Sequence, residues 1–155
     1  MKKSKEFILT SVMAIVITYT LALSLVSQAF PAGQTSRSLS STGTIQIQTT
    51  EGIGVYSNSQ CTVAQSTISW GTLEPGGAKN VIVYIKNEGS TPITLGLDSS
   101  NWSPLAASNY LNLGWNYNNQ PIGAGGSIAV TLTLTVSASI TGITSFAFDI
   151  TIGST

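Results

Sequence analysis

The sequence predicts an all-β fold, an antiparallel β-sandwich of the immunoglobulin-like or jelly-roll type, preceded by an N-terminal hydrophobic helix. Apolar and polar residues alternate with period two along most of the chain after residue 44, which is typical of strands with one buried face. Segments rich in Gly, Pro and Asn separate the alternating runs and supply turns. About eight short strands at this spacing fit either sandwich topology.

The clearest strand covers residues 128–136, where apolar residues face one way and threonines the other. β-branched and aromatic residues dominate this and the other runs, as a half-buried pleated surface prefers. The other expected strands are 44–48, 81–86, 93–98, 111–117 and 146–152. The expected turns are 74–77, 87–89, 118–121, 123–126 and 141–142. Only residues 104–109 suit a helical turn.

The start of the chain predicts export. Residues 7–36 contain no charged side chain, and the apolar run Phe7–Val26 has about the twenty residues that a membrane-spanning helix needs. Three lysines precede it and favour a cytoplasmic N-terminus. Ser27-Gln28-Ala29 fits the small-x-small pattern of a signal cleavage site, with Phe30 as the first mature residue. The alternative is a retained membrane anchor.

These features divide the chain into three parts and place the domain outside the cell. Residues 1–29 form a signal peptide or anchor helix, whose segment 7–29 contacts the membrane, residues 30–43 an extended arm or linker, and residues 44–155 the β-sandwich. The arm is polar and rich in small residues, so it suits either a flexible linker or a strand.

Composition excludes several classes of function. After residue 29 the chain carries three cationic and five anionic side chains, too few cations for nucleic-acid binding. There is no histidine, the commonest general base and zinc ligand. Cys61 is the only cysteine, so no intrachain disulfide forms. Since the few carboxylates fall in turns or at outward strand positions, we expect no enzyme, metal or cofactor.

Two features around residue 102 are candidates for surface functions. Asn101-Trp102-Ser103 is an N-glycosylation sequon in an expected loop, where Asn101 would carry the glycan. Trp102, beside Pro104, is expected to be free to contact a partner. The aromatic residues of the domain that lie in phase with apolar neighbours, Trp70, Trp115 and Tyr117, are instead expected in the core.

The segment Ile68–Gly89, with its Leu-x-Pro-Gly turn, alternating strand and Asn-x-Gly turn, resembles the exported β-domains of the TasA/camelysin group. The start Ser40–Ile45 and the end Ser139–Asp149 are similar to archaeal bundling-pilus subunits. The resemblance spans most of the expected sandwich.

The resemblance implies a structural subunit of an extracellular filament, a pilus or biofilm-matrix fibre. In that family the mature N-terminal arm enters the next subunit as a strand, which is β-augmentation of an incomplete sandwich. The implied partners are other copies of the chain in a head-to-tail polymer, with bundling between neighbouring filaments. The alternative is a membrane-anchored immunoglobulin-like binding module with the arm as a stalk. The donor-strand residues implied here are Phe30, Arg37, Leu39, Ile45 and Ile47.

Overall fold

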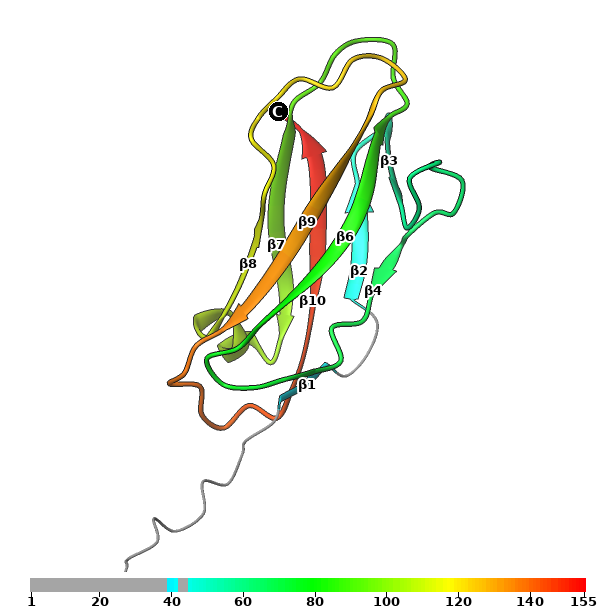
Figure 1. Cartoon of the computed structure of the whole chain (residues 1–155). Helices are drawn as coiled ribbons and strands as arrows, with labels where there is room; N and C mark the ends of the chain where they lie inside the picture. The colour runs from blue at the N-terminus through cyan, green and yellow to red at the C-terminus, as the bar shows by residue number, and fades with distance from the viewer. Residues whose placement is uncertain (1–38, 42–44) are drawn as a thin grey trace, which may run out of the picture. The chain divides into compact units, whose positions relative to one another are not determined.

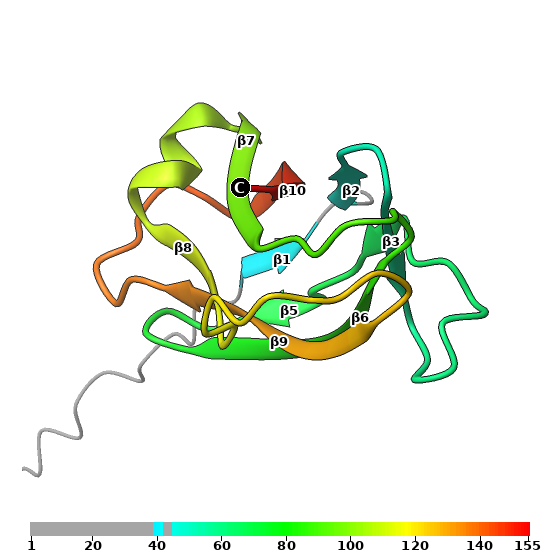
Figure 2. The same cartoon turned by 90° about the horizontal axis from the view of Figure 1, so that it is seen from above.

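Two β-sheets lie face to face in a sandwich-like arrangement (Figures 1 and 2). Apolar side chains from both sheets are buried in one core. The structure is a computed structural model and describes residues 39–41 and 45–155. The predicted all-β fold is confirmed for these residues. The expected hydrophobic helix, the cleavage site at Ala29 and Phe30, and Arg37 lie outside them.

The first sheet is centred on the last strand of the chain. Its order is β4-β2-β10-β1-β5, and β7 pairs with the other edge of β10. The strands of this sheet are β1 (Leu39–Ser41), β2 (Ile45–Thr49), β4 (Thr67–Ile68), β5 (Thr72–Leu73), β7 (Leu95–Ser103) and β10 (Ser145–Ser154). β1 and β2 run parallel to β10, and β7 runs antiparallel to it.

The second sheet is antiparallel throughout and has the order β3-β6-β9-β8. Its strands are β3 (Ile53–Tyr56), β6 (Ala78–Asn87), β8 (Leu111–Trp115) and β9 (Ser127–Val136). β6 and β9 form a long central ladder that pairs Ala78 with Thr135 at one end and Lys86 with Ser127 at the other.

The core follows the alternation of the sequence. In β9 the side chains of Val130, Leu132, Leu134 and Val136 are buried, as predicted. In β10 the buried side chains are Phe146, Phe148, Ile150 and Ile152. Trp70 and Tyr117 are also buried, and Trp115 packs against the core while half-exposed.

The expected helical turn is a 3₁₀ helix, η1 (Leu105–Asn109), which follows β7. The expectation for Trp102 is wrong. It lies in β7, not in a loop, and its ring stacks on Phe148 with 4.1 Å between centroids and 14° between planes. Stacking on the core removes the apolar surface of the ring from water within the subunit, so this surface is not left free to contact another protein. Within residues 39–41 and 45–155 no helix is long and apolar enough to cross a membrane.

Candidate functional site

The candidate site is the edge of β10 that faces β1 and β2. Ser40 pairs with Ser145, and Ile47 pairs with Ile150. Two successive pieces of the chain's N-terminal region therefore share one long edge of the last strand. Parallel pairing needs a long connection, and here almost the whole domain lies between the partners.

The two pieces do not form one regular ladder. From Ser41 to Ile47 the chain advances six positions, whereas β10 advances four between their partners Phe146 and Ile150. The register of the N-terminal region thus shifts by two residues against β10 between β1 and β2. β1 and β2 are two separate attachment points.

The outer strands of this sheet depend on the N-terminal region. Among the strands that the structure describes, β4 pairs with β2 alone, through Ile45–Ile68 and Gln46–Thr67. Among the same strands, β5 pairs with β1 alone, through Leu39–Leu73 and Ser40–Thr72. Both outer strands have two residues, so neither holds a place in a sheet by itself. If β1 and β2 left, this edge of β10 would be open and β4 and β5 would have no strand partner in the described part of the chain.

Ile45 is the apolar anchor of the N-terminal region. Its side chain is 0% exposed, and it lies opposite Ile68, itself 2% exposed. Ile47, two residues on and on the same face, is half-buried and packs against the core. Burying an isoleucine stabilises by roughly 1.5–3 kcal/mol. The intervening Gln46 is exposed on the outer face, as strand alternation requires.

A carboxylate on the outer face ties β2 to the rest of its sheet. Asp149 of β10 accepts hydrogen bonds through Oδ2 from Gln48 Nε2 of β2, at 3.2 Å, and from Asn101 Nδ2 of β7, at 2.7 Å. These two bonds span three neighbouring strands. Bonds of this kind to a charged acceptor are stronger than neutral ones.

The N-terminal region leaves the sheet through a short turn. Thr50 N–H donates to the carbonyl of Ile152 at 3.3 Å, and Thr50 Oγ1 accepts from the N–H of Ser154 at 3.2 Å. Gly52 then takes a positive φ of 81°, which glycine adopts without strain. The turn 50–52 is the only covalent link between β2 and β3.

The structure brings together part of the predicted donor strand. Leu39 lies in β1, and Ile45 and Ile47 lie in β2. Asn101 lies in β7 rather than in the expected loop, with a φ of 54° and its side-chain amide donating to Asp149. Its side chain is exposed, and its glycosylation stays a prediction. Cys61 is half-exposed and forms no disulfide.

The side chain of Asn87 joins two loops by hydrogen bonds, a role that the sequence pattern does not predict. It is 0% exposed, and its Nδ2 donates to the carbonyls of Thr91, at 2.7 Å, and Ile122, at 2.9 Å. Its Oδ1 accepts from the N–H of Gly89 at 2.9 Å. The Asn-x-Gly pattern predicts the turn, but it gives no sign that the asparagine also holds the loop containing Ile122.

Tyr56 and Glu88 form a second unforeseen pair, on the outer face of the second sheet. The Tyr56 hydroxyl donates a hydrogen bond to the Glu88 carboxylate. A Cβ at Gly54 would lie 2.6 Å from the Tyr56 ring and 2.8 Å from the Glu88 carboxylate, so this pair needs glycine beneath it. The bond to Glu88 raises the pKa of Tyr56 above its ordinary value.

This shift predicts a pH dependence. Because the folded pKa of Tyr56 is raised, the contribution of the Tyr56–Glu88 bond to stability is complete below the ordinary tyrosine pKa of about 10. It is lost as the pH rises through the folded pKa. Ultraviolet titration should show Tyr56 ionising above the ordinary tyrosine pKa, and Glu88→Gln should lower the pKa of Tyr56 toward that ordinary value. A titration that is identical in the variant would contradict the bond.

Among the described residues, no group of three or more His, Cys, Asp or Glu side chains could hold a metal ion. No protein-family model and no curated protein matches the chain.

Proposed function

We propose that the protein is a structural subunit of an extracellular filament that polymerises by strand donation through its N-terminal region. The observation that carries the proposal is that, among the described strands, only β1 and β2 attach β5 and β4 to their sheet. A sandwich whose sheet is completed by a terminal segment can be completed by the same segment of another copy. That exchange is β-augmentation in trans.

The exchange preserves contacts rather than creating them. A strand from another copy in the same slot would bury Ile45 against Ile68 and let Gln48 reach Asp149, as the chain's own strand does. The free energies of the two states therefore differ mainly through association entropy and any new contacts between subunits. The slot and the strand are different surfaces, so the contact is heterologous and propagates head to tail.

The turn 50–52 would be the linker between subunits. When β2 lies in another copy, the hydrogen bonds of Thr50 to β10 are also made to that copy. Only residues 50–52 separate β2 from the β3 of its own sandwich. A linker of this length keeps neighbouring subunits close. It favours a regular fibre over a flexible chain.

Export is part of the proposal. The N-terminal region can enter another copy freely only after cleavage after Ala29, which places Phe30 at the start of the mature protein. Its partners are then other copies of itself outside the cell, with bundling between fibres. The alternative to cleavage is a chain that keeps its hydrophobic segment and stays in the membrane, so that its N-terminal region does not enter another copy.

The full chain and a variant lacking residues 30–43 test this function. Protein recovered from the cell surface should begin near Phe30 and occur in high-molecular-weight fibres visible by electron microscopy. The deletion removes β1 and should leave exported chains that form no fibres. An intact chain with Met1 in the membrane fraction, or normal fibres from the deletion variant, would contradict the proposal. The first of these outcomes would favour the anchored binding module.

A further inference from the structure

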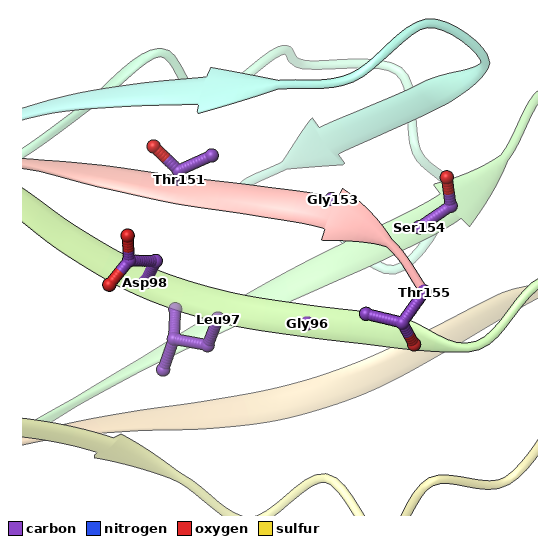
Figure 3. Close-up of a pocket in the computed structure, with 7 residues that line it drawn as sticks. All are labelled: Gly96, Leu97, Asp98, Thr151, Gly153, Ser154 and Thr155. Atoms are coloured by element: carbon purple, nitrogen blue, oxygen red, sulfur yellow. The ribbon is translucent and has the colours of Figure 1, made fainter.

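The outer face of the first sheet has a hollow where two glycines pair. Gly96 of β7 lies directly opposite Gly153 of β10, and both follow inward-facing buried residues, so the missing side chains leave the outer surface bare. Figure 3 shows these glycines side by side. The hollow has a volume of about 190 Å³, and its other lining residues are Leu97, Asp98, Thr151, Ser154 and Thr155.

Two threonine side chains lie close to the glycines. A Cβ at Gly96 would lie 2.7 Å from the Cγ2 of Thr155, and a Cβ at Gly153 would lie 3.2 Å from the Cγ2 of Thr50. Two threonine methyl groups therefore border the hollow beside the glycines. Such a hollow suits the tip of an aliphatic side chain better than a polar ligand, because threonine methyls and glycine Cα atoms form much of its surface.

The opposite face of the molecule carries a side chain of that kind. Ile82 of β6 points outward and is 58% exposed. Its cross-strand partner is Thr131, and the next pair along the face is Tyr84 and Ala129. Small neighbours on β9 leave Ile82 standing above the surface of the second sheet. It is one of three large apolar side chains that are clearly exposed among the described residues.

Charges lie at matching distances on the two faces. Lys86 is four positions from Ile82 on the outward face of β6, and Asp149 is four positions from Gly153 on the outward face of β10. Each separation is about 13 Å along a strand. Asp98 lies on the neighbouring strand β7, two positions from Gly96. It is opposite Thr151, which lies between Asp149 and Gly153 on β10. Within the described part of the chain, the side chains of Lys86 and Asp98 have no ion-pair or hydrogen-bond partner.

We propose that these faces bind one another between two copies of the chain. Ile82 of one copy enters the Gly96–Gly153 hollow of the next, and Lys86 lies against the carboxylates of Asp98 and Asp149. The match fixes the direction, because β6 must run antiparallel to the β10 on which it lies. Sheets that stack face to face keep their strands within about 30° of alignment, which this arrangement permits.

The contact is open-ended. The two faces are on opposite sides of the sandwich, so a copy that offers its hollow to one neighbour still offers Ile82 to another. Copies stack sheet upon sheet, across the strands rather than along them. The proposal does not rest on strand donation, which uses the edge of β10 and leaves both outer faces uncovered.

Cross-linking between single-cysteine copies tests the contact. In this register Tyr84 of one copy faces Thr151 of the next, and Ile82 is kept. The full chain, recovered after export, carries Cys61→Ser together with either Tyr84→Cys or Thr151→Cys, and the two preparations are mixed under mild oxidation. The mixture should give a disulfide-linked pair. The matched control replaces Tyr84→Cys with Leu105→Cys, at a residue of η1 that is 77% exposed, and should give little product. Equal yields from both mixtures would overturn the proposal.

Charge reversal is a second test of the association, and its result differs from that of a variant that fails to fold. Lys86→Asp should reduce the association of the copies, and combining it with Asp98→Lys should restore it. Repeating the cross-link in chains that lack residues 30–43 separates the two proposals. A pair that forms there without fibres supports the face contact even if strand donation fails. Fibres without a Tyr84–Thr151 cross-link retain strand donation and overturn the face contact.

Discussion

Replacing Ile45 with aspartate is expected to unfold the domain or leave it without β2, and so to abolish assembly. The side chain is 0% exposed and lies opposite Ile68. A carboxylate there would be buried without a partner, which costs on the order of 4 kcal/mol or more. That is a large part of the stability of a domain of this size.

Gln46→Asp is the matched control for Ile45→Asp. Gln46 is the next residue of the same strand, but its side chain is exposed on the outer face, so the change should alter the free energy of unfolding by about 0.5 kcal/mol or less. Ile45→Val should fall between them, at roughly 1 kcal/mol. Urea unfolding and electron microscopy measure the series. If Ile45→Asp and Gln46→Asp unfolded at the same urea concentration, β2 would not be part of the core.

Replacing Asn87 with alanine is expected to destabilise the domain by roughly 2–4 kcal/mol. The side chain is fully buried and makes three hydrogen bonds, two to the carbonyls of Thr91 and Ile122 and one from the N–H of Gly89. Alanine would leave these three backbone groups without their side-chain partner. The loop around Ile122 should also loosen, because it loses its side-chain hydrogen bond to β6 and keeps the backbone bonds of Gly125 and Gly126 to Asn87.

Two further variants test whether the lost stability comes from the hydrogen bonds of Asn87. Asn87→Asp keeps the size of the side chain, and Asn80→Ala makes the alanine change at an exposed position of the same strand. Aspartate keeps the size of the side chain but, when charged, faces the two carbonyls without a proton to donate, so it should cost at least as much as alanine. Asn80 lies on the same strand but is exposed, so its change to alanine should be nearly neutral. Urea unfolding compares the three variants, and equal stability of Asn87→Ala and Asn80→Ala would contradict the assigned role.

The fold could be predicted from the sequence where local periodicity decides it. Residues 128–136 alternate without a fault, and they form β9 with the expected face buried. β4 and β5 have two residues each, too few to show a period. The parallel pairing of β2 with β10 joins residues about a hundred positions apart, and no local signal encodes such a contact.

The candidate site also has a part that local periodicity predicts and a part that depends on contacts between distant segments. Ile45 and Ile47 stand out by alternation alone, because apolar residues at every second position indicate a strand with one buried face. The Asp149 bridge to Gln48 and Asn101 depends on three strands meeting side by side.

Two other features of the first sheet also depend on contacts between distant segments. The facing of Gly96 and Gly153 depends on the register of β7 against β10. For Trp102 the local sequence is misleading. Pro104, two residues on, suggests an exposed loop, but the Trp102 ring stacks on Phe148 of β10. A local pattern carries no information about a ring that a strand far along the chain supplies.

The most direct test of strand donation asks which copy's β10 holds β2. Gln48 pairs with Thr151 across the parallel ladder, and residues so placed fall within the Cα separation that a disulfide needs. The full chain carrying Cys61→Ser, Gln48→Cys and Thr151→Cys is exported, oxidised, and run on a denaturing gel without reductant. Strand donation predicts a covalent ladder of oligomers that reductant collapses to one band. A single internally linked monomer from material that forms fibres would show that each copy keeps its own strand, and would contradict the account.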